Sequence, residues 1–107
     1  MTDDRPQVLN ERGAVYGKME DNARVTQQLM DVVMSGANAK ALTPMHKECL
    51  HMVLHKISRM VNGNVMYVDN ATDMVGYSRL LEEWLIANPN IDGSNTETPS
   101  LLREQAL

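Results

Sequence analysis

The chain is poor in the residues that usually build a compact core, since its 107 residues include no Phe, one Trp and three Tyr, against nine Met. Hydrophobic residues still make up 43% of it, which argues against disorder throughout. Methionine fills irregular spaces but specifies a packed shape weakly. Because a small domain with few aromatic residues buries little surface alone, the sequence predicts a homo-oligomer.

Three further absences narrow the class of protein. The single cysteine, Cys49, excludes a disulfide within the chain and fits a reducing compartment. No apolar run approaches a membrane span, and residues 1–20 do not resemble a signal peptide. The net charge of −4 argues against non-specific binding to nucleic acid. We therefore expect a cytoplasmic protein without a membrane partner.

Apolar residues recur every three or four positions, which is the spacing of amphipathic helices, and no segment alternates as a strand does. We predict an all-α fold, a small bundle of four main helices around an antiparallel helix hairpin. Residues 1–88 would form this domain, and residues 89–107 a linker and a short C-terminal helical segment. The predicted helices cover about residues 5–11, 18–34, 44–61 and 69–88.

Start and stop signals set these boundaries. Gly13 ends the first predicted helix, and Thr43, followed by proline, caps the third. Gly63 ends the third helix, and Asp69 or Asn70 caps the fourth. The stripes predicted to be buried are Val25, Leu29, Val32 and Val33 on the second helix, Met45, Cys49, Met52, Val53, Ile57 and Met60 on the third, and Met74, Val75, Leu80, Leu81, Trp84 and Leu85 on the fourth.

Two cations and two carboxylates are predicted to meet at one end of the hairpin. Lys56 and Arg59 share a face near the end of the third helix, and Asp69, Asp73 and Tyr77 share one at the start of the fourth. In antiparallel helices, Arg59 would lie opposite Asp73, and Lys56 near Tyr77. One interpretation is a salt-bridged hairpin. The other is a pocket in which the cations hold phosphate and the aspartates bind a hydroxyl, a base edge or a metal.

Glycines beside tyrosines mark two further features. In the segment ERGAVYG, residues 11–17, glycines flank Tyr16 and predict a tight turn into a helix, where backbone N–H groups can hold an anion. Such turns are also common without a ligand. Gly76, next to Tyr77, would let another helix or a ligand approach closely.

A histidine pair is the only other candidate for chemistry. His51 and His55 are four residues apart, a geometry that can chelate a metal together with Glu48. There is no HExxH motif and no Ser/His/Asp arrangement. We therefore predict a solvated or partly packed histidine pair, with no metal site and no catalytic residue.

The segments ERGAVYGKMEDNARVTQ, HKISRMVNG and YVDNATDMVGYSRLL together resemble a family of small phage and prophage proteins of unknown function, over about residues 8–85. That family shows the pattern E-R-G-x-x-Y-G, an N-A pair, K-I-x-R-x-x-x-G and D-S-x-x-D-x-x-G-Y. Asn70 stands where the family usually has Ser. The matching residues are Glu11, Gly13, Tyr16, Gly17, Asn22, Ala23, Lys56, Arg59, Gly63, Asp69, Asp73, Gly76 and Tyr77.

The layout is more distantly similar to nucleotide-modification-associated phage domains and to the all-α, MazG-like nucleotide pyrophosphatases. Those enzymes hold magnesium with an ExxE motif on one helix and ExxD on the next. Here Lys56 and Arg59 stand where the enzymes place carboxylates, and the fourth helix offers DxxxD. The resemblance implies a nucleotide-like ligand and weakens the expectation of hydrolysis.

The leading hypothesis is therefore a phage protein of the host-cell cytoplasm that binds a nucleotide or another phosphorylated ligand, without a cofactor. By doing so it would sequester a nucleotide signal of the host's immune system. The predicted ligand-binding residues are Glu11, Tyr16, Gly17, Lys56, Arg59, Asp69, Asp73 and Tyr77.

Two alternatives remain open. The first is a divergent magnesium-dependent pyrophosphatase that uses Glu11, Glu48, Asp69 and Asp73. The second is an interaction protein that grips a host protein through a Met-rich surface and the C-terminal segment SLLREQAL, with the polar cluster purely structural.

Overall fold

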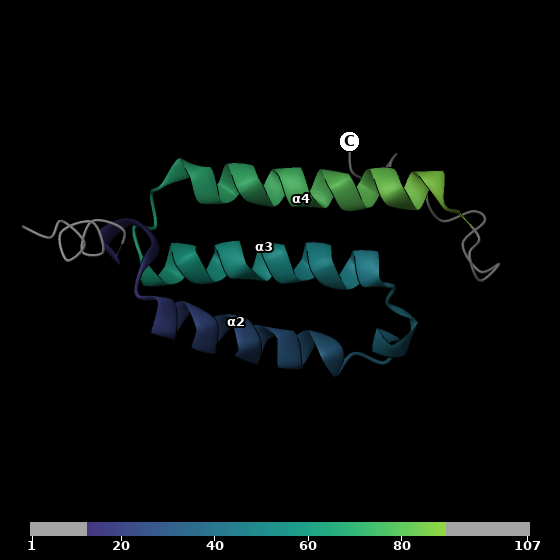
Figure 1. Ribbon diagram of the computed structural model, residues 1–107, viewed down its shortest axis with the longest axis horizontal. Helices are drawn as coiled ribbons and strands as arrows, with labels where there is room; N and C mark the ends of the chain where they lie inside the picture. Colours follow the sequence, from purple (N-terminus) through teal and green to yellow (C-terminus); the bar gives the residue numbers. More distant parts are fainter. Residues whose placement is uncertain (1–12, 90–107) are drawn as a thin grey trace, which may run out of the picture.

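The computed structural model describes residues 13–89, and every regular element within them is helical. The elements are α2 (Met19–Met34), the 3-10 helix η1 (Ala39–Ala41), α3 (Pro44–Asn62) and α4 (Val68–Ala87) (Figure 1). The predicted all-α fold is thus confirmed for three of its four helices. The predicted helix at 5–11 and the segment 90–107 lie outside the described residues. No helix within 13–89 is long and apolar enough to cross a membrane.

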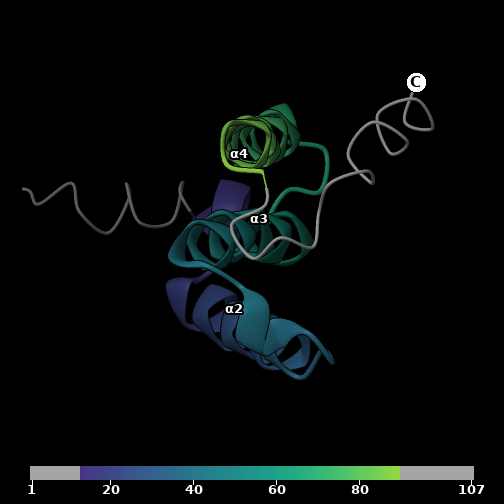
Figure 2. The same ribbon diagram turned by 90° about the vertical axis from the view of Figure 1, so that its right-hand side faces the viewer.

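The three long helices lie in one layer, with α3 between α2 and α4 (Figures 1 and 2). Ser58 of α3 contacts α2, and Lys56 of α3 contacts α4. At about 100° per residue, these two side chains leave α3 about 200° apart. α2 and α4 therefore pack on opposite sides of α3. The described helices form a layer, whereas the sequence predicted a bundle.

The start of α3 follows its sequence signals. The Thr43 hydroxyl accepts a hydrogen bond from the His46 backbone N–H at 3.3 Å, and the Thr43 N–H donates to His46 Nδ1 at 3.1 Å. This reciprocal pair is a capping box with histidine in the place of the usual Glu or Gln. The predicted cap at Thr43 is confirmed, and Gly63 ends the helix as predicted.

Two other boundaries differ from the prediction. Gly13 is itself helical, and Gly17, with a φ of 80°, separates residues 13–16 from α2. α4 has Tyr67 at its N-cap, so the predicted cap at Asp69 or Asn70 is wrong by two or three residues. The sequence gives no signal for either boundary. Glycine can occur inside a short helix, and the Tyr67 side chain makes no cap hydrogen bond.

Polar side chains occupy most of the buried positions. Thr26 of α2 donates a hydrogen bond to the Ser58 hydroxyl at 2.8 Å, and Ser58 donates to the Leu54 carbonyl at 3.0 Å. The interpretation of Cys49 as a core residue is confirmed. The buried residues of the described part of the chain are Asn22, Thr26, Ala39, Cys49, Ser58 and Asn70.

Several residues predicted to be buried are exposed instead. Val32 of α2 is 69% exposed, and Val75 and Leu80 of α4 are 67% and 49% exposed. Leu85 is also exposed. In a single layer only the α3-facing side of α2 and α4 is covered, which is why these side chains remain outside. Apart from its chain neighbours and its own helix backbone, no heavy atom of the described residues lies within 4 Å of a Cβ built on Gly76, so no other described helix approaches it closely.

Candidate functional site

Two glycines join the turn before α2 to the end of α3. A Cβ on Gly17 would lie 2.6 Å from the carbonyl oxygen of Asn62, and its positive φ also favours glycine. A Cβ on Gly63 would overlap the carbonyl oxygen of Val15. That same oxygen accepts a hydrogen bond from the Asn64 N–H at 2.9 Å. The two backbones therefore approach as closely as glycine allows.

Polar groups of the turn are used in holding it together. The Gly17 N–H donates to the Gly13 carbonyl at 2.8 Å, so this N–H is not available to an anion as the turn had suggested. Asn22 Nδ2 donates to the Tyr16 carbonyl at 2.7 Å, and Asn22 Oδ1 accepts from Asn62 Nδ2 at 3.1 Å. Gly17 therefore lets the backbone next to Tyr16 lie directly against Asn62.

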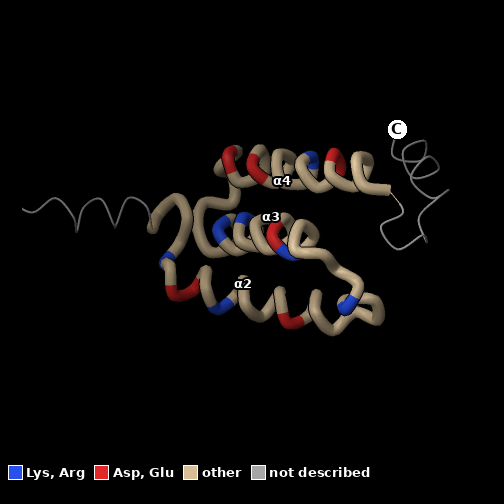
Figure 3. The backbone as a smooth tube through the Cα atoms, turned by 45° about the vertical axis from the view of Figure 1, so that its right-hand side comes forward, with Lys and Arg blue, Asp and Glu red and all other residues tan. Residues whose placement is uncertain are grey.

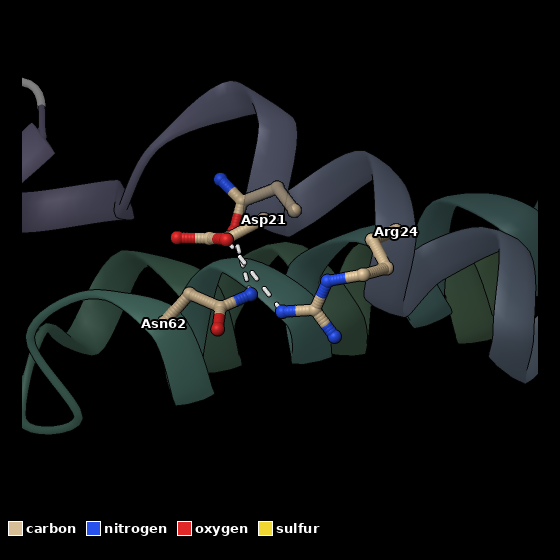
Figure 4. A network of polar contacts seen from close by, with 4 residues as sticks. Asp21, Arg24 and Asn62 are labelled. Carbon is tan, nitrogen blue, oxygen red and sulfur yellow. Dashed lines mark hydrogen bonds and ion pairs between the residues drawn. The ribbon is translucent and has the colours of Figure 1, made fainter.

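The start of α2 adds a charged pair beside this contact. Asp21 and Arg24 lie next to Asn62 of α3 (Figure 4), and the guanidinium of Arg24 is 3.5 Å from the carboxylate of Asp21. Both side chains are about half exposed, so the pair contributes little to stability. It does give Arg24 a carboxylate partner within its own helix.

The cationic end of α3 lies beside the acidic start of α4 (Figure 3). Here Lys56 Nζ is 3.0 Å from Asp73 Oδ2, with the lysine side chain only 11% exposed and the aspartate 46%. The prediction that Arg59 lies opposite Asp73 is therefore wrong. Lys56 projects from α3 toward α4, whereas Arg59, three residues later, is turned about 60° away from it.

Arg59 instead begins a chain of aromatic and polar contacts. Its guanidinium carbon lies 4.6 Å from the centroid of the Tyr16 ring, a cation–π distance. The Tyr16 ring meets that of Tyr67 edge to face at 5.6 Å. The Tyr67 hydroxyl donates to Asp69 Oδ2 at 2.9 Å. Hydrogen bonds with Tyr16 and then Asp69 raise the pKa of Tyr67 far above its usual value, so its phenol stays protonated.

The two cations of the site therefore differ in what they can bind. Lys56 is neutralised by Asp73. Within residues 13–89 no carboxylate forms an ion pair with Arg59. A guanidinium carries five N–H donors, so a contact with an aromatic ring leaves donors for an anion. Arg59 is thus the cation of this site suited to an anionic ligand.

Of the predicted ligand-binding residues, five come together where the Gly17 turn meets α3 and α4: Tyr16, Lys56, Arg59, Asp69 and Asp73. Tyr77 is partly exposed and lies one helical turn beyond Asp73, at the margin of this group. Glu11 lies outside the described residues.

Some residues of the site could not be recognised as such from the sequence. Tyr67 links Tyr16 to Asp69, although only its place two residues before Asp69 hinted at a role. Asn22 ties the turn to α3, and the N-A pair of the family pattern was a signal for it. Asn70 is buried, and its Nδ2 has no hydrogen-bond partner, which is costly inside a protein. The sequence pointed to Asn70 only as a possible helix cap and as a departure from the family pattern, and neither predicts its burial.

The histidine pair lies on α3 near these cations. The rings of His51 and His55 stack with centroids 6.5 Å apart. Burial and, after it, the positive charges of Arg59 and Lys56 lower the pKa of His55. Among residues 13–89, no group of three His, Cys, Asp or Glu side chains could hold a metal ion.

Comparison with known proteins adds a family but no activity. No curated protein and no solved structure matches the chain. A family model described as a domain of unknown function (DUF6378) matches residues 2–85, which include the stretch 8–85 that carries the motifs described above. Because this match covers most of its 107 residues, the chain belongs to that family.

Proposed function

We propose that the protein binds a nucleotide or another phosphorylated small ligand where the Gly17 turn meets α3 and α4. The observation that carries this proposal is Arg59, whose guanidinium is held against the Tyr16 ring without a carboxylate partner in residues 13–89. Guanidinium groups bind phosphate oxygens through two parallel N–H donors. Because Tyr16 already orients Arg59, little side-chain entropy is lost when an anion binds.

The neighbouring groups favour a ligand of mixed polarity over phosphate alone. Asp69 accepts one hydrogen bond from Tyr67 and has further acceptor capacity for a hydroxyl or a base N–H. The rings of Tyr16 and Tyr67 offer aromatic surface next to the cation. A nucleotide carries all three complementary features, namely phosphate, hydroxyl groups and a planar base.

The resemblance to small phage proteins suggests a biological use. We propose that the protein acts in the cytoplasm of an infected host, where it sequesters a nucleotide signal of the immune response. Binding without turnover is supported by Lys56 and Arg59, which stand where the MazG-like enzymes carry metal-binding carboxylates. A homo-oligomer is part of this proposal, since each copy would offer its own site.

The test is a retention experiment on the full chain. The protein is incubated with linear and cyclic nucleotides and magnesium, washed, and heated, and the released and unbound nucleotides are identified by chromatography. We expect an intact nucleotide to pass through the wash with the protein. Hydrolysed nucleotide would support the pyrophosphatase alternative. Retention of none would contradict the proposal and favour the interaction protein, in which the cluster is structural.

A further inference from the structure

One side of the helix layer carries the site, and the opposite side is apolar. Arg59 projects from α3 between the α2-facing and α4-facing directions. On the other side of α3, Leu50, Leu54, Ile57 and Val61 follow one another at spacings of four, three and four residues, which places them on one stripe. No described helix covers this stripe.

The flanking helices extend this apolar surface. Both α2 and α4 run antiparallel to α3 (Figure 1). The Thr26–Ser58 and Lys56–Asp73 contacts show which side of each helix faces α3, and the helical repeat then places the other residues around each helix axis. On the side of the α3 stripe, apolar residues recur along both helices, interrupted by Asp21 and Gln28 on α2 and by Ser78 on α4. This surface, the open apolar face, consists of Val25 and Val32 of α2, Leu50, Leu54, Ile57 and Val61 of α3, and Met74 and Leu85 of α4.

Few hydrophobic side chains of the described residues are fully buried. Ala39 and Cys49 are the buried hydrophobic residues among them, and both are small. On the open apolar face, Val32 and Val61 are 69% and 57% exposed. Stable domains pack at least two layers of secondary structure around a core, so a single layer of amphipathic helices calls for a second layer.

The segment after α4 is poorly suited to supply that layer. Residues 90–107 contain only Ile91, Leu101, Leu102, Ala106 and Leu107 as apolar residues. As a helix, residues 100–107 would extend about 12 Å, against about 28 Å for the 19 residues of α3. This segment therefore matches less than half of the stripe on α3 alone.

A second copy of the chain has the required shape and size. Three helices about 28 Å long and spaced 8–10 Å apart present a face of roughly 700 Å². Stable dimers bury about 800 Å² on each partner. We infer that two copies associate through their open apolar faces to form a two-layer, six-helix dimer. A two-fold axis lets the same patch pair with itself and keeps Arg59 of each copy on the outside.

The test is the mass of the full chain by sedimentation equilibrium across a concentration series. The double variant V32E/V61E places carboxylates at two positions that are exposed in one chain and buried in the dimer. The matched control M19E/L80E changes two residues that are 71% and 49% exposed. Leu80 is seven residues after Asp73 and so lies on the side of the site.

We expect the wild type and M19E/L80E to sediment as dimers, and V32E/V61E to dissociate at least 100-fold more readily. A monomeric wild type would overturn the inference, as would a dimer that V32E/V61E leaves intact or that both variants weaken equally. Nucleotide retention is scored on the same proteins. The site lies on the other side of the layer, so the two ideas can fail separately. A monomeric wild type that retains nucleotide would contradict only the dimer, and a dimer that retains none would contradict only the proposed function.

If V32E/V61E does not fold, conservative cysteine variants test the same surface. V61C and L80C are labelled with a maleimide at rising protein concentration, with wild type as the reference for the buried Cys49. We expect the labelling of V61C to slow at least ten-fold as the dimer forms, whereas L80C labels at a constant rate. Equal behaviour of the two variants would contradict the inference.

Discussion

The two sides of α3 are organised in opposite ways. At its C-terminal end, glycine contacts, buried amides and aromatic rings specify one arrangement within a single chain. On the open apolar face, aliphatic side chains lie side by side, and Val32, Val61 and Leu85 among them are exposed. The first region is held by contacts among residues 13–89, whereas the second is the surface through which we propose that two copies associate. The proposed site and the proposed dimer surface are therefore separate features of one small layer.

The largest effect is expected where the backbones meet. G63A would force a Cβ into the Val15 carbonyl, and G17A would add strain at a positive φ. Each should lower the free energy of unfolding by about 3 kcal/mol, as overpacking against rigid backbone does. G76A is the control, since its Cβ would enter open space in α4, and it should stabilise by about 0.5 to 1 kcal/mol. Urea unfolding measures all three, and equal effects would refute the close approach.

A smaller loss is expected at the ion pair between α3 and α4. D73N leaves the Lys56 ammonium, which is only 11% exposed, without its carboxylate. Since Asp73 is half exposed, we expect a loss of about 1 kcal/mol in urea unfolding. E83Q, which removes the exposed Arg79–Glu83 pair, should cost less than about 0.5 kcal/mol. A larger loss in E83Q than in D73N would show that Lys56 needs no partner.

The smallest effect concerns pH. Folded His55 binds its proton more weakly than the unfolded chain does, because burial and the neighbouring cations lower its pKa. Unfolding therefore takes up a proton below about pH 6.5, and stability falls as the pH is lowered through this range. Thermal melts between pH 7.5 and 5.5 should show a smaller fall in H55Q than in wild type or H51Q. An unchanged pH dependence in H55Q would assign the fall to other groups.

The sequence predicted the helices well because their signals are local. The cap at Thr43 and the glycine after α3 act within a few residues, and both are confirmed. Which cation pairs with Asp73 depends on how far α4 is shifted along α3. A difference of about one helical turn makes the partner Lys56 and not Arg59. Spacing within one helix does not determine that offset, so the cluster could be predicted but its partners could not.

The choice of buried face was the weaker prediction for a physical reason. Apolar residues occur on several sides of α4, so Val75 and Leu80 fit the helical spacing as well as the α3-facing residues do. The contact between α2 and α3 instead buries Thr26 and Ser58, which are joined by a hydrogen bond. Hydrophobic spacing cannot reveal an interface built on paired polar groups.

Binding to matched arginine variants tests the account most directly. Calorimetric titration would use wild type, R59A and R79A with the nucleotide that the wild-type protein retains. Arg79 lies on α4, 71% exposed and paired with Glu83, and so is a control for loss of one positive charge. Loss of a charge-assisted phosphate contact is worth about 1.5 to 3 kcal/mol, so R59A should bind at least ten-fold more weakly, with R79A close to wild type. A folded R59A protein that binds as tightly as wild type would contradict the proposed site.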